Sequence, residues 1–452
     1  MQIIKTLCHK ITNHSRIFDA TLVIYNDALS FIIDVIDKEF ANLDDMTTKS
    51  IVPAVEKLIH TTKSNPLPKY REFNSLFYKF PSYFRRGAIA IAFGKVKSYR
   101  SNYRNWEEEK AIYLSKGKKF TKKPPRLQLA HKEFPVFYRG NTFERTSETT
   151  AQIKVFHKND WIWIDIEFKE QDLYKRGVWD WKENNPKLVK IGKKYFLNFS
   201  HQSKVKLSKT KIIDQKVCAV DLGINNSAVC SVIDAKGTVL ARKFINQAKE
   251  KDQLYTMTNK LRKVQSISCW IAAPNFWRRI NGLQKHIVNN TSHEIVKFAN
   301  EHNCDVIVFE YLDKMKTPKG FYGAKKLRFK LRYWRKKGIQ NKVEEMAHYL
   351  GIRISRINAR NTSVLAFDGS GKVERNYKKD LATFITGKVY HADLSASYNI
   401  GARYFIRGLQ KATSEKKWLA LQAKVPELSK RTLQNLSSLI SLTKALESPK
   451  VA

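Results

Sequence analysis

The chain has 452 residues, long enough for two or three domains with substantial cores. It contains 83 Lys and Arg against 41 Asp and Glu, and the formal charge of +42 favours a polyanionic partner such as nucleic acid. No apolar run is long and charge-free enough to cross a membrane and no signal-peptide pattern opens the chain, so we expect neither a membrane partner nor secretion.

Residues 1–130 are predicted to be mainly helical. Apolar residues between Ile17 and Ile36 recur at helical spacing, and a second helical region runs from Tyr83 to Trp106 with Ala88, Ala92 and Val96 as its packing stripe. The rest of that second region is rich in cations, and Tyr99 and Tyr103 lie one helical turn apart. As a group they predict a surface that follows phosphates, although any one of them could be a solvated charge. The candidate nucleic-acid-binding residues are Arg85, Arg86, Lys95, Lys97, Tyr99, Arg100 and Arg104.

Residues 131–212 change to a β-rich pattern. The runs 153–156 and 161–168 read as two strands joined by a short turn, and 188–199 adds at least one more strand. We expect a small domain resembling a β-barrel. Trp161 and Trp163 are expected to pack under a helix rather than stack on bases.

Residues 213–410 carry a different order: a three-strand meander, helix, strand, helix, strand and helix. The apolar strand from Val217 ends on Asp221, and a continuously apolar later strand ends on Glu310. Between them we expect helices at about 247–268 and 292–303, with Pro274 breaking the chain. The segment 313–342 is dense in cations, 361–388 is expected to be an irregular insert, and the helix from Tyr390 carries Asp393 in its first turn. The tail, 411–452, is expected to be helical or loosely ordered.

This order is that of an RNase H-like mixed sheet, in which the first and fourth strands are neighbours. Asp221 and Glu310 should then lie side by side, with Asp393 presented by the covering helix. Three adjacent carboxylates repel one another unless a cation lies among them, and hard oxygen ligands suit Mg²⁺. Two such ions, for which Mn²⁺ could substitute, would support in-line phosphodiester cleavage.

The same residues carry a family resemblance. Val220-Asp221-Leu-Gly-Ile-Asn-Asn226-Ser-Ala228 resembles the first RuvC motif of the transposon-encoded TnpB proteins and their descendants, the type V CRISPR effectors. Val306-Ile-Val-Phe-Glu310-Tyr-Leu312 is similar to the second motif, and Asp393-Leu-Ser-Ala396-Ser-Tyr-Asn399-Ile400 to the third. The likeness is specific over about residues 216–406.

The resemblance implies a compact RNA-guided DNA endonuclease. A guide RNA would pair with one strand of a double-stranded DNA target, and the protein would read a short flanking motif. By motif, Asp221, Glu310 and Asp393 would be catalytic and bind the metal ions, and Asn226 and Asn399 would support them. The implied organisation is a helical recognition lobe (1–130) with an N-terminal β segment of a wedge domain (131–212), a RuvC-like nuclease domain (213–410) and a tail. The implied location is the prokaryotic cytoplasm, on nucleoid DNA.

One departure from the family concerns zinc. Many relatives carry a four-cysteine zinc ribbon between the second and third motifs, but the insert at about 358–390 has no cysteine, and none of the chain's five cysteines forms a CxxC pair. We therefore expect no zinc. Two alternative functions remain: an RNA-guided DNA-binding repressor that does not cleave, and an RNase H-fold transposase or resolvase that acts without RNA.

Overall fold

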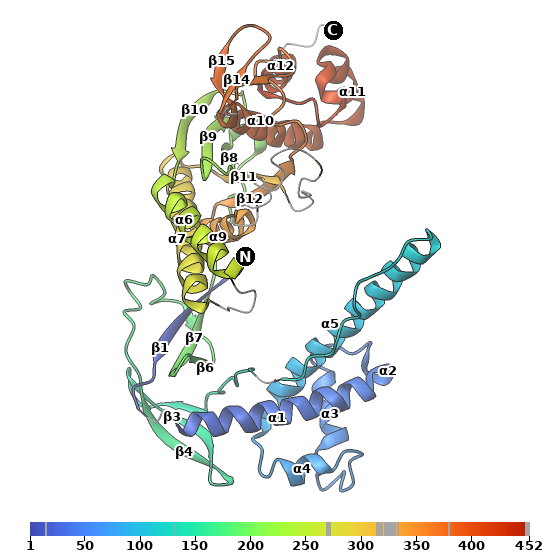
Figure 1. The fold of residues 1–452 in the computed structure, drawn as a ribbon, viewed down its shortest axis with the longest axis vertical. Coiled ribbons are helices and arrows are strands. Elements are labelled where there is room, and N and C mark those ends of the chain that lie inside the picture. Colours follow the sequence, from blue (N-terminus) through green and yellow to red (C-terminus); the bar gives the residue numbers. More distant parts are fainter. Residues whose placement is uncertain are drawn as a thin grey trace. The chain divides into compact units, whose positions relative to one another are not determined.

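The computed structural model describes residues 1–13, 16–130, 132–267, 273–312, 320, 331, 334–377 and 380–447. Most of the cation-dense segment 313–342 lies outside the described residues. The chain forms two compact units, one of residues 2–203 and one of Met1 with the residues from Lys204 onward (Figure 1). The fold is a mixture of helices and sheets in more than one unit, as predicted.

The first unit contains the predicted helices. Ala88, Ala92 and Val96 of α5 are fully buried and α5 packs against α1, which confirms the small-residue stripe. Trp161 is also buried, in an aromatic cluster with Phe80 and Phe84, as predicted. Trp163 is exposed, so its predicted packing under a helix was wrong, because it lies on the opposite face of the strand from Ile164 and Ile166. The helices are α1 (Ile17–Lys38), α2 (Phe40–Leu43), α3 (Ile51–Ile59), α4 (Glu72–Leu76) and α5 (Ser82–Ser115).

The strands of the first unit form two open sheets. One has the order β2-β3-β4, and the other has the order β1-β7-β5 with β6 also on β7. Isolated bridges such as Ile11–Phe168 link strand ends without continuing as a ladder. The predicted barrel-like closure was therefore wrong for the described strands, because too few of them pair to join the sheet edges. The strands are β1 (Gln2–Lys10), β2 (Phe143–Arg145), β3 (Thr150–His157), β4 (Asp160–Glu167), β5 (Lys182–Glu183), β6 (Lys187–Ile191) and β7 (Lys194–Lys204).

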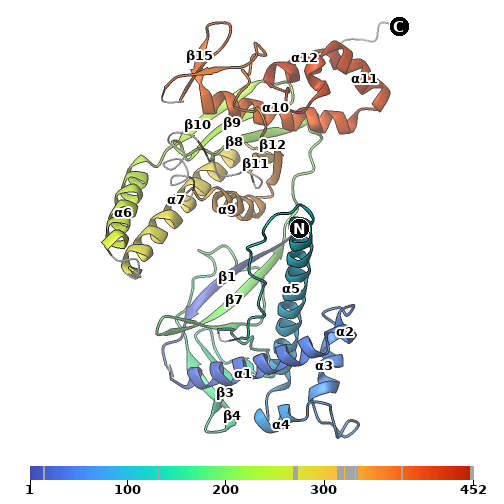
Figure 2. The ribbon, with the colours of Figure 1, turned by 45° about the vertical axis from the view of Figure 1, so that its right-hand side comes forward.

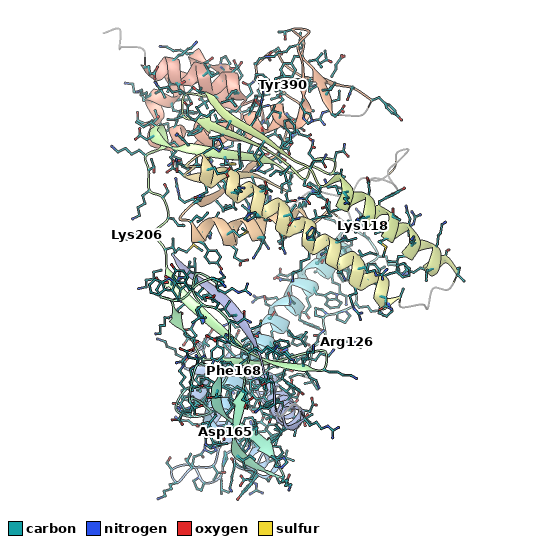
Figure 3. The ribbon with its side chains drawn as sticks, turned by 90° about the vertical axis from the view of Figure 1, so that its left-hand side faces the viewer. Lys118, Arg126, Asp165, Phe168, Lys206 and Tyr390 are labelled. Atoms are coloured by element: carbon teal, nitrogen blue, oxygen red, sulfur yellow. The ribbon has the colours of Figure 1, made fainter. Side chains whose placement is uncertain are left out.

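One hydrophobic core joins the helices and sheets of this unit. Phe18 and Ile33 of α1 belong to the same buried cluster as Ile153 of β3 and Leu197 of β7. Phe168, which follows β4 and is labelled in Figure 3, packs edge-on against His9. The division at residue 130 between lobe and wedge stays a prediction.

The second unit is built on a five-stranded mixed sheet of order β10-β9-β8-β11-β12. Strands β10, β9 and β8 are antiparallel, whereas β8, β11 and β12 are parallel. The predicted neighbourhood of the first and fourth strands is thus confirmed. The strands are β8 (Lys216–Asp221), β9 (Ala228–Asp234), β10 (Val239–Ile245), β11 (Val306–Tyr311) and β12 (Arg353–Asn358), and a 3-10 turn η1 (Ile212–Asp214) precedes them.

Helices cover both faces of this sheet. Alternate strand residues divide between two cores: Val217 and Ala219 face α10, whereas Cys218 and Val220 share a core with residues of α7 and α9. Figure 2 shows α11 and α12 beside α10, so the described part of the tail is helical and packed. The helices are α6 (Ala248–Ile267), α7 (Pro274–Glu301), α9 (Lys336–Tyr349), α10 (Ala392–Ala412), α11 (Glu415–Lys424), η2 (Pro426–Ser429) and α12 (Leu436–Glu447).

Two predictions about elements were wrong. Residues 292–303 are not a separate helix but the end of the 28-residue α7, and Pro274 begins that helix, where its missing N–H costs nothing. The insert is not irregular, because β13 (Glu374–Arg375), β14 (Leu381–Thr383) and β15 (Val389–His391) form a small antiparallel sheet. Tyr390, labelled in Figure 3, packs there against Phe367.

Candidate active site

Parallel pairing brings two of the predicted acids to one edge of the sheet. Val217 to Val220 of β8 pair in register with Val306 to Phe309 of β11. Asp221 and Glu310 each come one residue after the last pair. Because the carboxyl ends of parallel strands lie at the same edge, the two carboxylates are neighbours there.

The third acid reaches the same edge from α10. Asp393 lies in the first turn of this helix, which packs on β8 and β9. The loop after Asp221 passes close to it: a Cβ added at Gly223 would lie 3.6 Å from Asp393 Oδ2 and only 2.8 Å from the carbonyl oxygen of Asn226. Asn226 Nδ2 donates a 3.5 Å hydrogen bond to Asp393 Oδ2. Gly223 therefore permits a close approach that a larger residue would prevent.

The acids interact electrostatically. Burial raises the pKa of Asp221 well above its usual 3.8, and the negative charges of Glu310 and Asp393 raise it further, against an opposing effect of the Arg375 cation. Burial also raises the pKa of Glu310. Negative charge is thus concentrated at this edge of the sheet, and the nearby cation Arg375 does not neutralise it fully.

Glu310 is held by groups that its motif did not reveal. Thr362 Oγ1 donates a hydrogen bond to Glu310 Oε1, and this bond, followed by the charge of Arg403, opposes the effect of burial on its pKa. Arg403 is itself buried, and its guanidinium donates to four backbone carbonyls, those of Gln434, Asn358, Arg360 and Thr432.

Asn399 does not contact an acid but holds the segment that carries Thr362. Its fully buried amide donates to the carbonyls of Thr362 and Leu365, at 3.0 and 2.9 Å, and accepts a hydrogen bond from the N–H of Leu436. It thereby fixes the segment that carries Thr362. The structure thus gives the two predicted supporting amides different surroundings: Asn226 contacts an acid directly, and Asn399 acts through Thr362.

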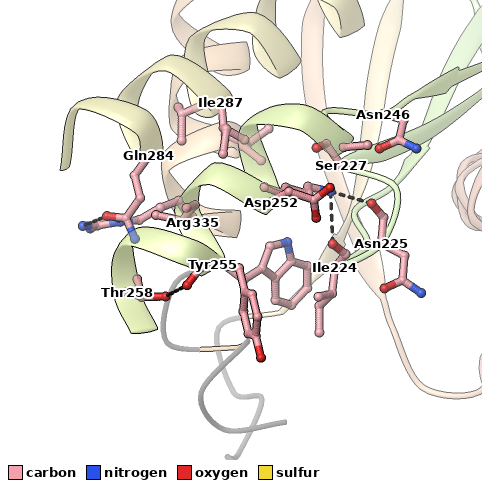
Figure 4. Close-up of a pocket in the computed structure, with 17 residues that line it drawn as sticks. Ile224, Asn225, Ser227, Asn246, Asp252, Tyr255, Thr258, Gln284, Ile287 and Arg335 are labelled. Carbon is pink, nitrogen blue, oxygen red and sulfur yellow. Dashed lines mark hydrogen bonds between the residues drawn. The ribbon is translucent and has the colours of Figure 1, made fainter. Parts of the chain in front are cut away.

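A half-buried lysine, Lys251, holds the loop between Asp221 and β9 by hydrogen bonds. Lys251 Nζ of α6 donates to the carbonyls of Ile224 and Asn225 at 3.0 and 2.6 Å (Figure 4). Burial lowers its pKa to about 8. The same loop and α6 line a cavity of about 500 Å³, which α7 and α9 complete. The loop position therefore depends on α6 as well as on the sheet.

The carboxylate groups of the three acids are suitable ligands for a divalent cation. Carboxylate oxygens are hard ligands of the kind that Mg²⁺ prefers, and the raised pKa of Asp221 reflects charge that a cation would compensate. However, within the described part of the chain, no group of three or more His, Cys, Asp or Glu side chains lies close enough to hold a metal ion.

The predicted nucleic-acid-binding residues of α5 mostly have partners within the first unit. Arg85 is buried and pairs with Glu56 at 3.1 Å, Lys95 pairs with Glu133 at 2.9 Å, and Arg100 pairs with Asp37 at 2.6 Å. Further contacts are those of Arg86 with Glu56, Lys97 with the carbonyl of Asp44, and Tyr99 with the ring of Tyr103. Arg104 is exposed. These pairs hold α5 in place, and phosphate binding by this surface stays a prediction.

Sequence reasoning missed Thr362, Arg375, Arg403 and Lys251. One signal was available for Arg403, because a lone cation in an otherwise apolar stretch of helix is unusual. Nothing local distinguishes Thr362 or Lys251 from other polar residues. In the described part of the chain, no helix has the length and hydropathy needed to span a membrane.

Comparisons with known proteins agree with the motifs. The chain is 24% identical over 232 residues to the TnpB-like protein aq_aa05 of Aquifex aeolicus (strain VF5), covering 47% of this chain and 75% of that protein. The family described as Aq_aa04 matches residues 4–157. The resemblance to TnpB-like proteins is therefore confirmed.

Solved structures show a more distant likeness. A cryo-EM structure of a Cas12f1–sgRNA–target DNA complex matches with a TM-score of 0.47 and 15% identity, over 88% of this chain and 98% of that one. A mini-RNA-guided endonuclease, CRISPR-Cas_phi3, matches with a TM-score of 0.44 and 10% identity, over 88% and 92%.

Proposed function

We propose that this protein, a relative of the TnpB-like proteins, is an RNA-guided DNA endonuclease whose catalytic carboxylates are Asp221, Glu310 and Asp393. One observation carries the proposal: Asp221 and Glu310 follow paired positions of two adjacent parallel strands, and burial together with the charges of Glu310 and Asp393 raises the pKa of Asp221. Clustered, mutually repelling acids in a protein of charge +42 are costly unless they have a function. The sheet order supports an RNase H-like, RuvC-type domain.

The three carboxylates would hold divalent cations, Mg²⁺ or Mn²⁺. When bound, such ions would supply an activated water and stabilise the leaving 3′ oxygen of a phosphodiester. The chain's own residues position the ligands. Thr362 orients Glu310 and Asn226 orients Asp393. Lys251 holds the loop between β8 and β9, which carries Asn226.

The proposed partners are a guide RNA and double-stranded DNA. Base pairing would select the sequence, and the surplus of cations would hold the backbones, since phosphate contacts carry affinity but no sequence information. A short flanking DNA motif would be read by the protein. The proposed location is the prokaryotic cytoplasm, on nucleoid DNA.

One observation favours a second candidate. Because the acids are not gathered closely enough to hold a metal ion, the protein could be an RNA-guided DNA-binding repressor that does not cleave. This candidate shares the partners and differs in the reaction, so a cleavage assay separates the two.

The test begins with purification from the host and sequencing of the RNA that accompanies the protein. The complex is then incubated with matching double-stranded DNA and Mg²⁺. We expect the parent to cut, and Asp221→Asn to lose at least about 10³-fold in rate while binding DNA as tightly as before. Asp214→Asn, which alters an exposed acid of the same unit, is the matched control and should cut normally.

Binding without cutting by the parent would support the repressor. Absence of co-purifying RNA would refute guidance by RNA. Loss of DNA binding in Asp221→Asn would assign that residue a structural role.

A further inference from the structure

A second polar pocket lies within the same unit, at the other end of the parallel strands. It has a volume of about 340 Å³ and is lined by residues of β12 and α10 with parts of η1 and β11. Val306 and Arg353, which line it, begin β11 and β12, whereas Glu310 lies near the end of β11. At roughly 3.3 Å per residue, this distance along the strand is about 13 Å, so the pocket is separate from the acids. We call it the Arg353 pocket.

The Arg353 pocket is lined by cations and by no acid. Arg353 comes from β12, and Arg407 and Lys411 lie one helical turn apart on α10. None of the three forms an ion pair with a carboxylate among the described residues. Asp305 interacts electrostatically with Arg353, but its carboxylate already accepts hydrogen bonds from the hydroxyls of Ser208 and Thr210 and from the N–H of Lys216.

Most polar groups around the pocket are satisfied by one another. Arg407 donates to the carbonyl of Arg356 and to Ser355 Oγ, at 2.9 and 2.6 Å. Tyr404 donates to Gln215 Oε1 at 2.8 Å. These bonds fix Arg407 as a pre-positioned positive charge.

Arg353 is only partly satisfied, because its side chain hydrogen-bonds with Tyr404 but two of its nitrogens remain without a partner. Its Nε and Nη2 atoms are buried and have no hydrogen-bond partner in the structure. Buried guanidinium N–H groups without acceptors are costly, and neighbouring donors of one guanidinium match two oxygens of a phosphate. With Arg407 and Lys411 beside it, an anion with at least two acceptor oxygens would satisfy these two groups.

We propose that the Arg353 pocket binds a phosphate group of a nucleic-acid backbone. The choice of a nucleic acid as the source of the phosphate rests on the proposed function. The pocket then anchors a strand at the sheet end opposite to the acids. It contributes affinity without reading sequence, as phosphate contacts do.

The test uses full-length protein carrying Asp221→Asn, without divalent cations, so that it does not depend on cleavage. The probes are a short fluorescent single-stranded oligonucleotide, as DNA and as RNA, and inorganic phosphate at constant ionic strength. We expect Arg353→Gln to weaken oligonucleotide binding about tenfold and to reduce the salt slope by about one. Arg353→Lys should be intermediate, because it keeps the charge and loses the fork.

Lys417→Gln, an exposed cation of α11 in the same unit, is the matched control and should change affinity less than about twofold. Inorganic phosphate should raise the unfolding temperature of the Asp221→Asn protein and of Lys417→Gln more than that of Arg353→Gln. If Arg353→Gln does not fold, Arg353→Lys and Lys411→Gln are compared with Lys417→Gln in its place.

Equal losses in Arg353→Gln and Lys417→Gln would overturn the proposal. So would phosphate binding that depends on Arg353 while oligonucleotide affinity does not, because the pocket would then serve a free anion. If no guide RNA is found but these results hold, the proposed function fails and the nucleic-acid site stands.

Discussion

At the scale of single residues, Asp221 gives the clearest prediction. Its folded pKa lies above 3.8, so the folded protein binds a proton more tightly than the unfolded chain does. The stability that this provides is present below about pH 4 and is lost as pH rises through the folded pKa. At neutral pH, the ionised side chain therefore destabilises the metal-free protein.

Asp221→Asn should accordingly raise the unfolding temperature of the metal-free protein at pH 7, by about 2–4 °C for each kcal/mol of repulsion removed. The gain over the parent should shrink as pH falls toward 4. Mg²⁺ should stabilise the parent more than Asp221→Asn. Differential scanning calorimetry across pH checks all three, and an unchanged or lower unfolding temperature in Asp221→Asn at pH 7 would contradict the assigned repulsion.

The sequence identified some residues of the site and could not identify others. Asp221 and Glu310 each end an apolar strand, which is a local signal. Thr362 matters only because Asn399 and the chain fold place its hydroxyl against Glu310. Such partners are set by packing between distant segments, which local sequence does not encode.

At the scale of elements, α6 and the loop between β8 and β9 are joined by Lys251. Replacing it by Met would remove the hydrogen bonds to the carbonyls of Ile224 and Asn225, a cost of about 1 kcal/mol at this partly exposed position. The loop that carries Asn226 and closes on Asp393 should then lose its fixed position.

We expect Lys251→Met to lower the cleavage rate about tenfold or more while leaving DNA affinity within about twofold. A small misplacement of catalytic groups lowers the reaction rate much more than it weakens binding of the DNA. Lys249→Met, an exposed cation of the same helix, should cut at the parent rate. Single-turnover cleavage with separate binding measurements tests this. Equal rates in the two variants would show that the contact does not position the loop.

The errors about elements have physical causes. Pro274 was expected to break a helix, but at a first helical position its fixed φ and absent N–H are favourable, so the helix begins there. Strands β13, β14 and β15 have two or three residues each, too few for an alternation of apolar and polar residues to be visible. Aromatic packing around Phe367, rather than strand pattern, holds that sheet together.

At the scale of the whole molecule, the charge of +42 should dominate the proposed interactions with nucleic acid. Each phosphate contact releases about one counterion, so six or more contacts should cost on the order of 10³-fold in affinity between roughly 50 and 200 mM salt. Fluorescence anisotropy with single-stranded DNA over a salt series measures the slope. A nearly flat dependence would mean that the surplus charge does not hold the backbone.

The structure also limits which cations can act in this way. On α5, Arg85, Lys95 and Arg100 are occupied by Glu56, Glu133 and Asp37, so their charges serve packing within the first unit at least in part. Composition shows how much charge is in surplus but not which cations lack partners. The two unpartnered nitrogens of Arg353 depend on the positions of its neighbours in the fold, which composition does not give.

The sequence by itself determined the types and order of most elements, the small-residue stripe of α5, the sheet edge that carries the acids and the relationship to TnpB-like proteins. These follow from periodic burial and from short motifs, both of which are local properties of a chain. Only the tertiary structure decided four features: the hydrogen bond from Thr362 to Glu310, the hydrogen bonds of Lys251 to the loop, the open sheets of the first unit, and the two guanidinium nitrogens of Arg353 that lack a partner. Each depends on which distant groups meet, and that is set by the packing of the whole unit.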